Sequence, residues 1–117
     1  MLKQRYRFHG HSSLRYLFSK GRSFKSGFLL LKAVKNSRRL NSRVAVIVSK
    51  KTVKSAVKRN RIRRRIYEII RFRINKFNDV YDLAIMVYSD KAIDIDNDKL
   101  IEMIDLGLKK IGLIDKI

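Results

Sequence analysis

The chain of 117 residues contains no cysteine, no proline and no tryptophan. Without cysteine it can form neither disulfides nor thiolate metal sites, although this absence does not report the redox compartment. It also has no apolar run near the roughly 18 residues that a membrane-spanning helix needs. The first seven residues lack the apolar core of a secretion signal. We therefore expect a cytoplasmic protein without a membrane partner.

Acidic residues are missing from more than half of the chain. Residues 1–67 carry 21 Lys or Arg and no Asp or Glu, whereas residues 68–117 carry 8 basic and 10 acidic residues. The formal net charge is +19, yet 45% of the residues are apolar and can bury a modest core. This predicts a single domain over residues 1–117. Its basic surface should lie on the first half of the fold, which favours a nucleic-acid partner.

The hydrophobic pattern predicts a mixed α+β domain. Two apolar runs flank the polar loop 36–42, which suggests an antiparallel pair, while a later strand–helix–strand order suggests parallel neighbours. Together these elements indicate a two-layer sandwich with a mixed sheet and helices. The predicted elements are an extended segment at 1–11, a short helix before Gly21, strands at about 28–34, 43–49 and 82–88, a long helix from Ser55 to about Phe77, and a helix at about 98–111.

The most informative segment is Lys50–Ile66, in which nine of seventeen positions are Lys or Arg. At 100° per residue its helical part predicts an apolar stripe and an outward basic face. Arg59 and Arg63 lie near the edge of the stripe, where they would overhang the end of the sheet. A solvated basic face is the alternative, but no acid in the first 67 residues balances the charge. The stripe consists of Ile62, Ile66, Ile69, Ile70 and Phe77, and the outward face of Arg61, Arg64, Arg65 and Arg71.

The sequence contains no constellation typical of a protein-borne active site. It has no plausible Ser-His-Asp grouping, and a metal-dependent nuclease would need carboxylates near the surface that binds its nucleic acid. Asp94, Asp96 and Asp98 are spaced as in a calcium loop, but Lys99 stands where the sharp turn needs Gly. We interpret these aspartates as an acidic helix start and predict no metal site on the protein.

Two motifs carry a family resemblance. The segments V-S-K-K (Val48–Lys51) and A-V-K-R-N-R-I-R-R (Ala56–Arg64) resemble the protein subunit of bacterial ribonuclease P, and the likeness extends over roughly residues 5–111. The resemblance implies a sandwich of the ribosomal protein S5 domain 2-like type with a left-handed β-α-β crossover, against the usual right-handed rule. It also implies binding to a catalytic RNA and to the 5′ leader of precursor tRNA, with no protein partner required. The RNA and its bound Mg²⁺ would then remove the leader.

The same resemblance implies the site residues. Leu14 and Leu31 stand where family members usually carry aromatic residues, and the loop after Lys51 lacks the usual Gly-Asn, so leader binding should depend more on apolar packing and charge than on stacking. Leu14 and Phe18 could also be plain core residues. The implied RNA-binding residues are Lys50, Lys51, Lys58, Arg59, Asn60, Arg61, Arg63, Arg64 and Arg65. The implied leader cleft, between the first helix and the sheet, contains Leu14, Phe18, Leu29, Leu31, Ile47 and Ser49.

Two questions stay open at this level. The assignment of Leu29, Leu31 and Ile47 to the cleft depends on the strand register, because a shift of one residue exchanges the faces. The second question is the class of protein, since a non-enzymatic RNA-binding ribosomal protein or ribosome-assembly factor has a similar composition and fold type. The V-S-K-K and R-N-R context favours the ribonuclease P subunit.

Overall fold

The structure, a computed structural model, describes the backbone of residues 11–115 and the side chains of residues 14–115. Most of the segment expected to be extended, residues 1–10, lies outside this range. No helix in the described range is both long and apolar enough to cross a membrane. The elements are α1 (His11–Lys20), β1 (Arg22–Ser26), β2 (Leu29–Lys35), β3 (Arg43–Val48), α2 (Ala56–Arg71), β4 (Tyr81–Val87) and α3 (Asn97–Ile111), with short 3₁₀ turns η2 (Ile74–Lys76) and η3 (Asp90–Ile93).

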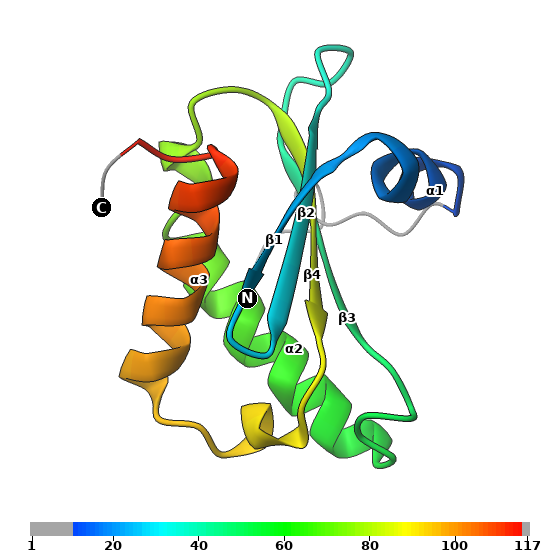
Figure 1. Cartoon of the computed structure of the whole chain (residues 1–117), viewed down its shortest axis with the longest axis vertical. Coiled ribbons are helices and arrows are strands. Elements are labelled where there is room, and N and C mark those ends of the chain that lie inside the picture. The colour runs from blue at the N-terminus through cyan, green and yellow to red at the C-terminus, as the bar shows by residue number, and fades with distance from the viewer. Residues whose placement is uncertain (1–10, 116–117) are drawn as a thin grey trace.

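The described strands form one mixed sheet in the order β1-β2-β4-β3. Strand β2 runs antiparallel to β1 and β4, and β3 runs parallel to β4. Helices α2 and α3 cover one face of the sheet, while α1 crosses the other face (Figure 1). This confirms the α+β sandwich and the parallel pair that the β3–α2–β4 crossover predicts. The left hand of the crossover stays a prediction of the resemblance.

The expected antiparallel pairing of β2 with β3 is wrong, because β4 lies between these two strands. All seven residues of β4 are buried, and a central position gives this strand a hydrogen-bonding neighbour on both edges. The hydrophobic pattern does not predict strand β1, since Phe24 is its one apolar residue. The sequence feature that indicates β1 is Gly27, which forms the tight turn between β1 and β2 with φ of 58°. Helix α2 ends at Arg71, six residues before the expected end at Phe77.

The main core lies between the sheet and helices α2 and α3. Ile62, Ile66, Ile69 and Ile70 of α2 are buried there, as the predicted stripe requires. Helix α3 approaches the sheet closely at Gly107, where a Cβ atom would lie 2.8 Å from the Leu31 side chain. The missing side chain of Gly107 therefore makes room for a large leucine on β2.

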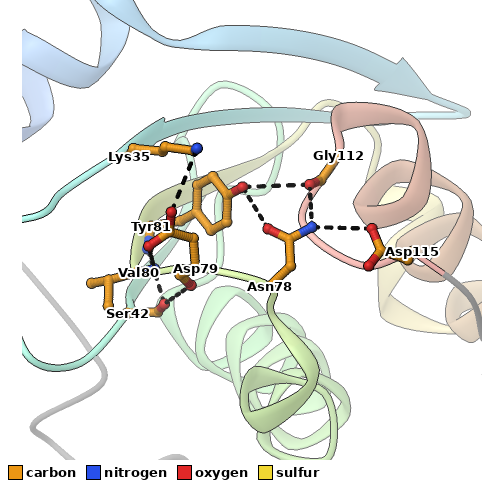
Figure 2. A network of polar contacts seen from close by, with 8 residues as sticks. All are labelled: Lys35, Ser42, Asn78, Asp79, Val80, Tyr81, Gly112 and Asp115. Carbon is orange, nitrogen blue, oxygen red and sulfur yellow. Dashed lines mark hydrogen bonds and ion pairs between the residues drawn. The ribbon is translucent and has the colours of Figure 1, made fainter.

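A polar network joins the end of α3 to the start of β4 (Figure 2). Gly112 ends α3 with φ of 92°, and its carbonyl accepts a hydrogen bond from Asn78 Nδ2 at 3.0 Å. The Asn78 Oδ1 atom accepts in turn from the Tyr81 hydroxyl at 2.7 Å. Positive φ is costly for residues with a Cβ, which explains glycine at this position. The network holds the first residue of β4 in place at one end of the sheet.

Candidate RNA-binding surfaces

A tight turn connects β3 to α2 and presents two lysines. The Val53 N–H donates to the Ser49 carbonyl at 3.1 Å, and the Ser49 and Thr52 hydroxyls lie 3.1 Å apart. Val53 is buried, whereas Lys50 and Lys51 are exposed. Ser55 then caps α2 by accepting from the Lys58 N–H, which confirms the predicted helix start. The turn therefore holds both lysines beside the positive end of the helix dipole.

Arg59 and Arg63 are half-buried, in agreement with their predicted place at the edge of the stripe. Arg59 Nη1 donates to the carbonyls of Val53 at 2.9 Å and Lys54 at 2.8 Å. Arg63 Nη2 donates to Asn60 Oδ1. These contacts order both guanidinium groups without neutralising them, because the acceptors are uncharged. Each arginine thus keeps its charge for an anionic partner.

The predicted outward orientation of Arg65 is wrong. Its guanidinium donates to the carbonyls of Ala92 at 3.0 Å, Ile93 at 3.2 Å and Ile95 at 2.6 Å. A rotation of 100° per residue puts Arg65 only about 60° from Ile62, on the flank of the buried stripe. The segment containing η3 packs against this flank of α2. Arg65 therefore fastens η3 to α2, and its place among the RNA-binding residues is not supported by its contacts.

Replacing Arg65 with methionine is expected to lower the free energy of unfolding by about 2–3 kcal/mol. Methionine preserves much of the apolar stem, but it leaves three carbonyls without their charged donor. Urea unfolding followed by circular dichroism measures the change. The control is Arg64→Met, because Arg64 is exposed and its loss should change stability by about 0.5 kcal/mol or less. Equal stabilities of the two variants would contradict the assigned role of Arg65.

Five of the six remaining cations of this segment form the basic surface, defined here as Lys50, Lys51, Lys58, Arg61 and Arg64. All five are exposed, and no acidic side chain in the described range forms an ion pair with them. The first acid along the chain, Glu68, pairs with Arg71 at 2.8 Å. Because the basic surface lacks internal counter-charges, it is suited to a polyanion.

The face of the sheet under α1 is the second candidate surface. The strand registers place Leu30 and Lys32 of β2, Ile47 of β3 and Met86 of β4 on this α1 face. The predicted positions of Leu29 and Leu31 are wrong, because both side chains are fully buried on the opposite face. The predicted cleft assignment is shifted by one residue along β2, which exchanges the two faces of the strand. Leu31 faces helices α2 and α3 because Gly107 of α3 has no side chain and leaves room for it. Sequence reasoning missed Leu30 and Lys32, which neighbour the residues it selected.

Helix α1 covers the α1 face only in part. Leu17 is fully buried against Ala45, Ala84 and Met86 and thus anchors the helix. Phe18, in contrast, keeps 40% of its surface exposed. Leu14 and Ile47 are half-buried beside this contact. The alternative in which Phe18 is a plain core residue does not fit its exposure, so its ring is available to a ligand.

Lys32 of β2 contacts both the backbone and the ring of Phe18 on α1. Its Nζ atom donates to the Phe18 carbonyl at 2.9 Å and lies 5.7 Å from the centre of the Phe18 ring. The ammonium group caps the C-terminal end of the helix and interacts with the ring through a cation–π contact. The α1 face therefore combines an exposed aromatic ring with a positive charge. Ser49 is exposed at the end of β3, where the α1 face meets the basic surface.

Comparisons with known proteins agree with this geometry. The family model described as Ribonuclease P matches residues 2–112. The ribonuclease P protein component of Roseiflexus castenholzii is 30% identical, with 97% of this chain and 91% of that protein covered. The component of Clostridium novyi is also 30% identical, with 96% and 98% covered.

Solved structures show the same fold. The RNase P protein of Staphylococcus aureus superimposes with a TM-score of 0.82 at 22% identity, covering 93% of this chain and 97% of that one. The RNase P protein of Thermotoga maritima gives a TM-score of 0.74 at 19% identity, covering 86% and 92%. The family match spans both candidate surfaces, and the ribosomal alternative receives no support from these relatives. The chain therefore belongs to the ribonuclease P protein family and is the protein component of a tRNA-processing ribonucleoprotein.

Proposed function

We propose that the protein docks on the catalytic RNA of ribonuclease P through its basic surface. The observation that carries this proposal is the set of exposed cations without acidic partners on α2 and the turn before it. Neutralising RNA phosphates releases condensed counterions, which supplies affinity that falls with salt. Arg59 and Arg63 support the docking, since their hydrogen bonds to neutral oxygens hold the guanidinium groups in place.

The α1 face is proposed to bind the 5′ leader of precursor tRNA. A single-stranded leader offers unpaired bases, which stack on aromatic rings and pack on apolar side chains. Phe18, Leu30 and Ile47 provide that surface, and Lys32 adds a charge for a phosphate. Because Ile47 lies near the end of β3, and only Val48 and Ser49 separate it from Lys50 in the chain, a leader on the α1 face would lie next to RNA bound at the basic surface.

Hydrolysis of the precursor is proposed to belong to the RNA subunit and its Mg²⁺ ions. In the described range no group of three or more His, Cys, Asp or Glu residues is arranged to hold a metal ion. The two buried carboxylates, Asp82 and Asp105, each pair with an arginine, and Asp105 raises the pKa of Arg73. The protein's contribution is then positioning of the substrate and screening of phosphate repulsion, which raises the effective affinity of the RNA for Mg²⁺.

Replacing Phe18 with alanine tests the leader proposal. We expect affinity for precursor tRNA to fall about tenfold, in line with the loss of one stacked base, while affinity for mature tRNA stays unchanged. Binding is measured with the assembled ribonucleoprotein and both tRNA forms. The matched control is Phe72→Ala, because Phe72 is also exposed but lies at the end of α2. Equal losses on precursor and mature tRNA would mean that Phe18 has a structural role.

A further inference from the structure

A pocket of about 490 Å³ lies where α1 faces the loop between β2 and β3. Its size falls within the ~300–1,000 Å³ typical of small-molecule sites. Tyr16 of α1 forms one wall, Arg38 and Arg39 of the loop form another, and Arg43 and Asp82 also line it. Figure 1 shows this loop projecting at the top of the molecule, beyond the helical layers. Neither the basic surface nor the Phe18 region includes these residues.

The pocket has two cations without acidic partners. Arg43 and Asp82 form a buried bidentate pair, with Nε and Nη2 at 2.9 and 2.8 Å from the two carboxylate oxygens. Lys35 pairs at 3.5 Å with Asp79, whose pKa is lowered first by the Val80 N–H and then by Lys35. Arg38 and Arg39 are exposed, and no carboxylate in the described range forms an ion pair with either. The pocket is therefore positively charged.

The loop that carries these arginines is anchored at both ends. At one end, Asn36 donates its backbone N–H to the Val80 carbonyl at 2.9 Å and its side-chain amide to Asp82 at 2.9 Å. At the other end, Ser42 Oγ accepts from the Tyr81 N–H at 2.9 Å and donates to the Asp79 carbonyl (Figure 2). Anchoring lowers the entropy lost when the arginines bind a ligand.

Tyr16 adds an aromatic surface to this charge. It keeps 56% of its surface exposed, although α1 is packed on the sheet through the adjacent Leu17. Within the described range its hydroxyl has no hydrogen-bond partner. Paired guanidinium groups bind phosphate oxygens, and a tyrosine ring stacks on any base. This combination is typical of sites for unpaired nucleotides.

We propose that this pocket binds one unpaired RNA nucleotide, with its phosphate at Arg38 and Arg39 and its base on Tyr16. The proposal rests on the RNA-binding role above but concerns a separate site. Strand β3 begins in the pocket at Arg43 and ends at Val48 beside the basic surface, so the two sites lie roughly 17 Å apart along the strand. An RNA contacting both would be held at two points on the protein.

The test is a titration of a fluorescent single-stranded RNA ten-mer with the full chain, followed by anisotropy at several salt concentrations. The double variant Arg38→Ala/Arg39→Ala should bind about tenfold more weakly and lower the log–log salt slope by about 0.7, the value for one lost phosphate contact on a single strand. Tyr16→Ala should also bind about tenfold more weakly, while Tyr16→Phe, which keeps the ring, should match the unaltered chain. The charge control is Lys109→Ala/Lys110→Ala, at the exposed end of α3.

The outcomes separate this proposal from the docking proposal. If the loop variant loses no more affinity than the α3 control, or if Tyr16→Ala binds like the unaltered chain, the pocket is not a nucleotide site. The proposal that the basic surface docks on the catalytic RNA would be unaffected, because it is tested separately by replacing Arg61 and Arg64. The titration is then repeated with the catalytic RNA and, separately, with precursor tRNA. The RNA for which the loop and Tyr16 variants lose affinity is the one that supplies the nucleotide. A loss with neither RNA overturns the site in the ribonucleoprotein.

Discussion

Replacing Asp82 with alanine is expected to lower the free energy of unfolding by about 3–5 kcal/mol, the largest stability effect we predict. Asp82 lies on the central strand and accepts hydrogen bonds from Arg43 and Asn36. Its removal leaves a buried guanidinium group without its bidentate carboxylate partner, and frees the amide that anchors the loop between β2 and β3. Urea unfolding measures the loss, with Glu102→Ala on the exposed side of α3 as a control that should change little.

A second variant distinguishes the effect of the Arg43–Asp82 ion pair on stability from the effect of packing around it. Arg43→Met/Asp82→Leu removes both charges and fills most of the volume, so it should recover much of the stability lost by Asp82→Ala. Recovery would show that the penalty comes from an uncompensated buried charge. If Asp82→Ala alone unfolds no more easily than the Glu102→Ala control, the pair contributes nothing to the fold and our account of this end of the sheet is wrong.

Removing Arg61 and Arg64 together is expected to weaken binding to the catalytic RNA by about 10–100-fold at moderate salt. The slope of log K against log salt should fall by about two units, one for each lost phosphate contact. Both side chains are exposed on α2, so the unfolding free energy should change little. Filter binding or anisotropy over a range of salt concentrations gives both quantities.

Two controls define the meaning of that result. Lys109→Ala/Lys110→Ala removes the same charge from α3 and should leave the slope nearly unchanged. Arg61→Lys/Arg64→Lys keeps the charge but loses the planar guanidinium groups, so it should preserve the slope while losing part of the affinity. An unchanged slope in the alanine variant would remove Arg61 and Arg64 from the RNA interface.

Local signals predicted local structure well. Ser55 caps α2 as expected, and the isoleucines spaced along the helix are buried, because caps and helical periodicity depend on neighbouring residues only. The parallel pairing of β3 with β4 also follows from the strand–helix–strand order. In the same way, the lack of acids before Glu68 predicted the basic surface, since charge balance can be read directly from the sequence.

Features that depend on distant contacts were mispredicted. Strand β4 lies between β2 and β3 because it is the strand that is buried on both faces. The short loop at 36–42 joins β2 to β3 in the chain but contains no information about which strand lies between them. Leu31 faces the helices because Gly107, far along the chain, makes room for it. Arg65 is covered by η3, an element absent from the predicted set. The pocket at Tyr16 likewise joins α1 to a loop some twenty residues later, with the pair Arg38 and Arg39 as its one sequence signal.

Cleavage of a 5′-extended precursor tRNA tests whether the protein assists an RNA catalyst. Three samples are compared at low Mg²⁺: the protein alone, the cognate ribonuclease P RNA alone, and both together. We expect efficient removal of the leader only when both are present, which would place the chemistry in the RNA and the positioning in the protein. Cleavage by the protein alone, or no change on adding the protein to its RNA, would contradict this expectation.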